Sequence, residues 1–129
     1  MDGQAFLTHF EMGKLHPFPH HDHIYMAWLY LRRAGWDEGY AHIQSGLKHF
    51  ATAHGQPDKY HETITRFWAL LVHHAIEHEP EIDNFLVFKQ KFPLLFDKFS
   101  IKKHYSDAVL WSDTARQTWV EPDVIPMPS

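Results

Sequence analysis

Proline and glycine residues divide this chain into segments of helical length. The breaks fall at Pro17, Pro19, Gly35, Gly55 to Pro57, Pro80 and Pro93. At such positions a helix starts, ends or cannot continue. The segments between them carry apolar residues at spacings of three and four, and no segment alternates over more than a few residues. This periodicity favours helix over strand. We therefore predict an all-α fold, a bundle of four to five helices with up-down topology.

The expected boundaries follow from capping residues and breakers. Long helices are predicted over residues 19–33, 37–54, 57–79 and 82–92, and Ser106 and Ser112 are each expected to cap a short helix. Gly35 has the place of a left-handed cap after the first helix. Residues 1–17 are expected to form an N-terminal lead and residues 121–129 an extended tail. The whole chain, residues 1–129, is expected to be a single helical domain.

The composition excludes several classes of protein. The chain has no cysteine, which removes disulfides and thiolate sites. Its net charge of −4, with no run of Lys or Arg longer than a pair, argues against nucleic acid as a partner. The longest apolar run, Ile24–Leu31, is too short to span a bilayer, and the first ten residues lack a signal-peptide pattern. We expect a cytoplasmic protein with neither a nucleic-acid nor a membrane partner.

Two histidine-bearing segments lie where helices are expected to begin. They are His20-His21-Asp22-His23 and Lys59-Tyr60-His61-Glu62-Thr63, out of thirteen histidines in the chain. Because helices joined by short loops pack antiparallel, the first and third helices should run parallel and share one pole. His20 and His23, three residues apart, share a face from which His21 is rotated away. His61 aligns with the apolar face of its helix and is expected to point into the bundle.

This arrangement predicts a metal site. The proposed ligands are His20, His23, His61 and Glu62, because imidazoles combined with one carboxylate are typical of open sites for Zn, Fe, Ni or Cu. A mononuclear site is favoured, since the paired Glu-x-x-His pattern of di-iron bundles is absent. Glu62 and Tyr60 are the candidate catalytic groups, placed for proton transfer. Such a site would suit a metal-dependent enzyme of unknown substrate, although the sequence alone does not decide whether the chain is an enzyme.

Other interpretations of the same residues stay open. Two helix N-termini with Lys59, His21 and His61 would form a metal-free pocket for an anionic small molecule. The chain is alternatively a protein-interaction module and a possible homodimer, since Trp36, Trp111 and Trp119 could leave apolar surface exposed. In a third, purely structural interpretation, the histidines and threonines of these segments make only local hydrogen bonds.

A second group of histidines is expected at the opposite pole. It comprises His73, His74 and His78. His74 and His78 are four residues apart, a spacing that allows both to bind one metal ion. Their neighbours Glu77 and Glu79 favour a solvated helix end instead.

The pattern of the two segments also resembles that of a known group of proteins. His20-x-x-His23 at the head of one helix and Lys59-Tyr60-His61-Glu62-Thr63-Ile64-Thr65 at the head of another resemble short bacterial all-helical proteins of unassigned function. The resemblance covers residues 18–71. It implies that His23, His61, Glu62 and Thr65 act as a unit, and it implies no substrate.

Overall fold

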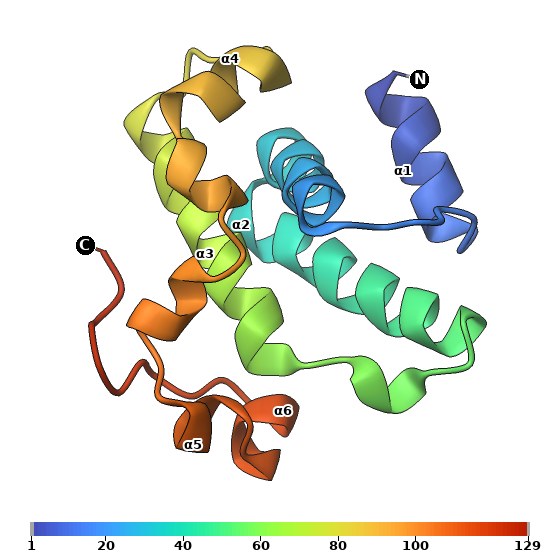
Figure 1. The fold of residues 1–129 in the computed structure, drawn as a ribbon. Helices are drawn as coiled ribbons and strands as arrows, with labels where there is room; N and C mark the ends of the chain where they lie inside the picture. Colours follow the sequence, from blue (N-terminus) through green and yellow to red (C-terminus); the bar gives the residue numbers. More distant parts are fainter. Residues whose placement is uncertain (1, 129) are drawn as a thin grey trace. The chain divides into compact units, whose positions relative to one another are not determined.

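The computed structural model describes residues 2–128, and its contacts divide the chain into two compact units between Tyr60 and His61. Helices make up each unit, and residues 2–128 contain no β-strand, which confirms the all-α prediction (Figure 1). No helix in this range is both long enough and apolar enough to cross a membrane. The two units are described in turn.

The first unit consists of α1 (Gly3–Glu11), α2 (His20–Ala53) and the short 3-10 helix η1 (Pro57–Lys59). The side chain of Asp2 caps α1 by accepting a hydrogen bond from the Ala5 N–H at 2.8 Å. Phe10 is fully buried where α1 meets α2. A Cβ atom at Gly46 would lie 2.6 Å from the Phe10 ring, so this close approach requires glycine.

Helix α2 has two halves that meet at Gly35. This residue has φ +78° and ψ −172°, a conformation that side-chain-bearing residues rarely adopt. Across this break the ring centroids of Tyr30 and His42 lie 5.3 Å apart, and Phe18, just before α2, lies 4.9 Å from Phe50 in the second half. The segment that leads into α2 is therefore close to its last turns. The helices expected over 19–33 and 37–54 are both present and are separated at the predicted glycine.

The second unit begins with α3 (Glu62–His78) and α4 (Phe85–Lys91). The 3-10 helices η2 (Pro93–Phe96) and η3 (Ser100–Lys103) follow, and then the short helices α5 (Asp107–Leu110) and α6 (Asp113–Gln117). One buried cluster joins α3 to η3 and α5, and it consists of Phe67, Ile101, Tyr105 and Leu110. Ser106 and Ser112 cap α5 and α6, as predicted.

Three boundaries differ from the sequence prediction, each for a local reason. The lead expected over residues 1–17 contains α1, which the Asp2 cap and the buried Phe10 stabilise. The third long helix starts at Glu62, because residues 57–59 form η1 and Tyr60 is extended. The fourth starts at Phe85, because the Asn84 side chain accepts a hydrogen bond from the Val87 N–H at 3.1 Å and caps the helix there.

The geometry of Gly35 gives a prediction about the first unit. Gly35→Ala should lower the free energy of unfolding by about 1–3 kcal/mol, because φ is positive and ψ is extended. Gly35→Asn should be no better, since asparagine tolerates the left-handed helical region and not this one. Chemical denaturation measures both variants. Equal stability of either variant and the wild type would contradict the break at this glycine.

Candidate functional site

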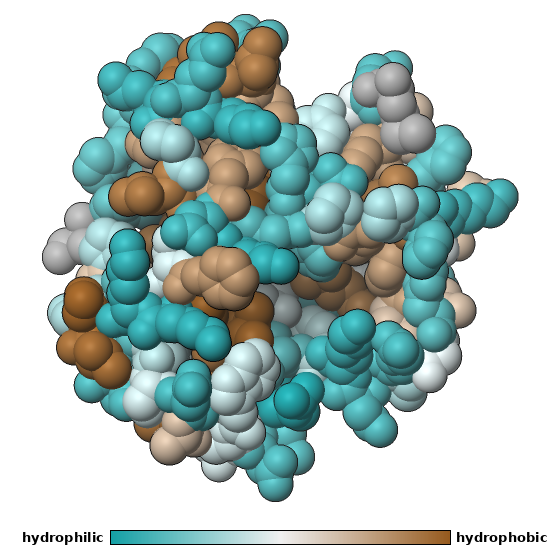
Figure 2. Space-filling model, viewed as in Figure 1, coloured by the Kyte–Doolittle hydropathy of each residue, from teal (hydrophilic) through white to brown (hydrophobic). Residues whose placement is uncertain are grey.

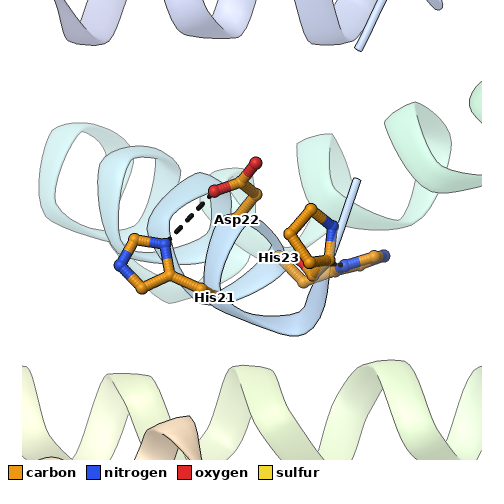
Figure 3. Close-up of polar contacts among 4 residues, drawn as sticks. His21, Asp22 and His23 are labelled. Carbon is orange, nitrogen blue, oxygen red and sulfur yellow. Dashed lines mark hydrogen bonds and ion pairs between the residues drawn. The ribbon is translucent and has the colours of Figure 1, made fainter. Parts of the chain in front are cut away.

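The first histidine segment forms the opening turn of α2. Pro19 is the N-cap residue and offers no side-chain hydrogen bond, while Asp22 places a carboxylate in the first turn. The Nδ1 atom of His21 lies 3.2 Å from Oδ1 of Asp22. Figure 3 shows His21 and His23 on opposite sides of the helix, as the sequence predicted. His21 is therefore paired locally and does not share a face with His23.

His23 is the more enclosed of these imidazoles. Its Nδ1–H donates a hydrogen bond to the Pro19 carbonyl at 3.1 Å, and its ring stacks on Phe18 with 3.9 Å between centroids. Burial lowers the pKa of His23, and the nearby His20 lowers it further. The ring is thus neutral at pH 7 with Nε2 as its acceptor nitrogen.

An aromatic cluster joins this turn to the end of α2. Phe18 packs on Phe50, and Phe50 stacks on His54 with 4.3 Å between centroids. The Nε2–H of His54 donates a hydrogen bond to the Gly13 carbonyl at 3.0 Å. The C-terminal end of α2 therefore lies against the segment that leads into its first turn.

The second segment is divided by the boundary between the units. Lys59 ends η1 and is exposed, and the Lys48 ammonium lies 5.3 Å from the centre of the Tyr60 ring. Glu62 is the first residue of α3 and is half-buried. Lys59 and Tyr60 thus belong to the first unit, whereas His61 and Glu62 belong to the second.

His61 has a structural role that the sequence did not predict. It is the N-cap of α3, with φ −136° and ψ 110°, and its Nδ1 accepts a hydrogen bond from the Ile64 N–H at 3.1 Å. Its Nε2–H donates to the buried Leu110 carbonyl at 2.7 Å. The prediction that His61 points inward is correct, since only 6% of the residue is exposed. Both ring nitrogens are engaged, and the neutral ring has its hydrogen on Nε2.

The charge state of His61 follows from this environment. Burial lowers its pKa, the hydrogen bond to Leu110 raises it, and the positive charge of Arg116 lowers it again, with a net lowering. A protonated ring would also carry hydrogen on Nδ1 and would lose the bond from Ile64. The neutral imidazole is therefore part of the folded structure.

Two threonines of the same segment also bond to backbone. The Thr63 hydroxyl is fully buried, donates to the Thr118 carbonyl at 2.8 Å and accepts from the Val120 N–H at 3.1 Å. The Thr65 hydroxyl donates to the His61 carbonyl at 2.8 Å. The first turn of α3 thus holds the chain around residues 110, 118 and 120.

Residues 104–106 hold the rest of the tail, and the sequence did not predict this role. The Nδ1–H of His104 donates to the Ile125 carbonyl at 2.8 Å, and the Tyr105 hydroxyl donates to the Val120 carbonyl. The Ser106 N–H donates to Oδ1 of Asp123 at 2.9 Å, and hydrogen bonding from the side chain and then the backbone of Ser106 lowers the pKa of that carboxyl. The His104 side chain is half-buried against the Phe67 ring. Residues 121–128 of the predicted tail contain no helix or strand and are bound to the second unit, and residue 129 lies outside the described residues.

These contacts constrain the predicted metal centre. A metal ion on His61 would have to displace either the Ile64 N–H or the Leu110 carbonyl from the ring. Residues 2–128 contain no group of three or more His, Asp or Glu side chains arranged to hold a metal. His20 and His23 lie in the first unit, so their convergence with His61 and Glu62 stays a prediction.

The same contacts bear on the anion-binding alternative. In the second unit, His61 Nδ1 occupies the capping position at the N-terminus of α3 where an anion would accept hydrogen bonds. The remaining candidates for that pocket, Lys59 and His21, belong to the first unit. Their approach to His61 also stays a prediction.

No protein-family model, curated protein or solved structure matches this chain. The function therefore has to be inferred from the chemistry of the residues themselves. In the second unit, that chemistry makes the start of α3 a structural centre.

Substitutions at His61 test this role. His61→Ala should lower the free energy of unfolding by about 2–4 kcal/mol, because it removes the helix cap and leaves the Leu110 carbonyl unpaired. His61→Asn should cost less, since asparagine caps helices well. The exposed His49→Ala is the matched control and should change stability by less than about 0.5 kcal/mol. Equal losses for His61→Ala and His49→Ala would refute the structural role.

The pH dependence of these variants gives a second readout. The pKa of His61 is lower in the folded state than the unfolded value of 6.5. The stability from its neutral ring is therefore complete above that pH and decreases as the pH falls below it. The His61→Asn variant should lose part of this acid sensitivity. The same slope in both proteins would count against a buried neutral His61.

Proposed function

We propose that this protein is a self-associating interaction module, with a surface of the second unit as the contact between two copies. Within residues 77–103, this surface comprises an acidic arm, a basic arm and a set of exposed apolar side chains. The acidic arm contains Glu77, Glu79, Glu81 and Asp83, and the basic arm contains Lys89, Lys91, Lys98, Lys102 and Lys103. Exposed apolar side chains belong to both α4 and the basic arm, and they are Leu86, Val87, Leu94 and Phe99.

The exposed apolar side chains carry this proposal. Leu86 is 64% exposed, Leu94 71% and Phe99 62%, although the chain buries many other large apolar residues. Figure 2 shows hydrophobic residues at the surface over α4, among hydrophilic ones. Several apolar side chains exposed along one segment are typical of a protein contact, whereas single ones are ordinary.

The order of charges supports a second copy as the partner. Leu86 and Val87 lie in the sequence between the acidic arm and the basic arm. In a two-fold dimer, if residue i of one copy contacts residue j of the other, then residue j of the first copy contacts residue i of the second. A surface with opposite charges on either side of an apolar centre is therefore self-complementary. The acidic arm of one copy would face the basic arm of the other, with α4 near the axis.

Contacts within one copy already use some of these charges. The Lys91 ammonium lies 3.3 Å from Glu79, so these two charges pair within the chain and the contact between copies would rely on the remaining charges of the two arms. The ammonium groups of Lys89 and Lys98 lie 5.5 Å and 5.3 Å from the ring centres of Phe96 and Phe99. These lysines combine a positive charge with an apolar stem and an aromatic face, and such a surface favours an acidic partner over a neutral one.

A protein partner fits this surface better than an anionic bilayer. The five lysines of the basic arm are accompanied by Asp97 and preceded by four acidic residues of the acidic arm. A uniformly negative membrane would attract one arm and repel the other. A partner with both charges satisfies both arms.

Sedimentation velocity tests the proposal with paired charge reversals. The wild type should be a dimer at low ionic strength and dissociate as salt is raised, because the arms attract over about one Debye length. One variant carries Glu81→Lys and Asp83→Lys, and the other carries Lys89→Glu and Lys98→Glu. Each alone should be monomeric, and an equimolar mixture should form a heterodimer.

Apolar substitutions supply the matched control. Leu86→Ser should weaken the dimer, whereas Val124→Ser, at a similarly exposed position in the tail, should leave it intact. Circular dichroism confirms that each variant is folded. A monomeric wild type at every salt concentration would overturn the proposal. Binding of a monomer to phosphatidylserine vesicles would assign the surface to membranes instead, and would overturn it equally.

A further inference from the structure

The last turns of α3 carry two imidazoles that face one another. His74 and His78 are four residues apart on a regular helix, so their side chains project from the same face. Their ring centroids are 4.3 Å apart, with 44° between the ring planes. We infer that this pair is a two-histidine site for a divalent transition-metal ion, completed by water.

The ring separation suits chelation. With metal–nitrogen bonds of about 2.0–2.1 Å, two imidazoles on one ion have centroids roughly 4.5–5 Å apart. The observed separation is 4.3 Å, so a rotation of the exposed His78 side chain has to move its ring by only a few tenths of an ångström to reach that range. Both residues belong to one regular helix, so the two ligands come from a single rigid element.

The position on the helix favours a cation. The C-terminal end of a helix carries partial negative charge from carbonyl groups without intrahelical partners. Glu77 and Glu79 also lie at this end, but Glu77 contacts His73 and Glu79 pairs with Lys91. A divalent ion at this end would therefore be stabilised by the helix carbonyls, in contrast to one placed at a helix N-terminus.

The neighbouring histidine is engaged differently. The Nε2 atom of His73 lies 2.9 Å from a carboxylate oxygen of Glu77, also across one helical turn. This ion pair leaves His73 outside the pair formed by His74 and His78. His73 therefore serves as a matched control, since it is also a histidine and lies next to His74 on the same helix.

Two protein ligands set the expected selectivity. Imidazole nitrogens suit Zn²⁺, Ni²⁺ and Cu²⁺, and Cu²⁺ should bind most tightly of the three. A metal ion binds the neutral imidazole, so protons compete with the metal and acid should weaken the site. The acidic arm of the proposed dimer begins beside this site, but the metal ligands His74 and His78 are not part of the dimer surface, so the charge-reversal variants and the glutamine variants test the two proposals separately.

An NMR titration with Zn²⁺ at pH 7.5 tests the site. The imidazole signals of His74 and His78 should be the first to shift, ahead of the other eleven histidines. His74→Gln and His78→Gln should each weaken the tightest Zn²⁺ site by about tenfold or more. His73→Gln should leave it unchanged, and the thermal stabilisation by Zn²⁺ should follow the same order.

Two results would overturn the inference. One is a tightest site that survives both His74→Gln and His78→Gln. The other is a tightest site lost in His61→Asn or His23→Gln, which would place the metal where the sequence first predicted it. Circular dichroism of the glutamine variants shows that any loss of binding is not a loss of fold.

Discussion

The imidazole of His61 makes two hydrogen bonds on which the second unit depends. One satisfies the first turn of α3, and the other satisfies a buried carbonyl at the end of α5. Residues 49 positions apart are thereby joined by one side chain that must be neutral and in one tautomer. Thr63, two residues later, extends the same connection to residues 118 and 120. A buried polar network of this kind is stable only when all its members are paired.

The sequence predicted the helices well and their connections poorly, for physical reasons. Apolar periodicity and the breakers located α2, the break at Gly35 and the caps at Ser106 and Ser112, because these are local effects. It did not predict α1, although Asp2 and the spacing of Phe6 and Phe10 are an ordinary helix signal. The cap at His61 was missed because histidine is not a preferred N-cap residue. The tail contacts depend on backbone carbonyls far along the chain, which carry no sequence pattern.

The histidines of this chain differ in what their rings contact, and this separates their roles. His23, His54, His61 and His104 each bond to a backbone carbonyl. Such rings stabilise the two units. Their pattern in the sequence resembles that of a metal site, because structural hydrogen bonding and metal binding both need imidazoles that point inward. His74 and His78, on the last turns of α3, instead have their rings next to one another. The acidic and basic arms follow it in the sequence, so the features proposed for binding belong to residues 74–103.

The central claim is that His61 is a neutral structural group. Long-range ¹H–¹⁵N NMR of the imidazole ring, followed over pH, tests it most directly. We expect hydrogen on Nε2 alone, an unprotonated Nδ1 that accepts a hydrogen bond, and a pKa below the ordinary histidine value of 6.5. A ring with hydrogen on Nδ1, or a pKa at or above 6.5, would contradict it.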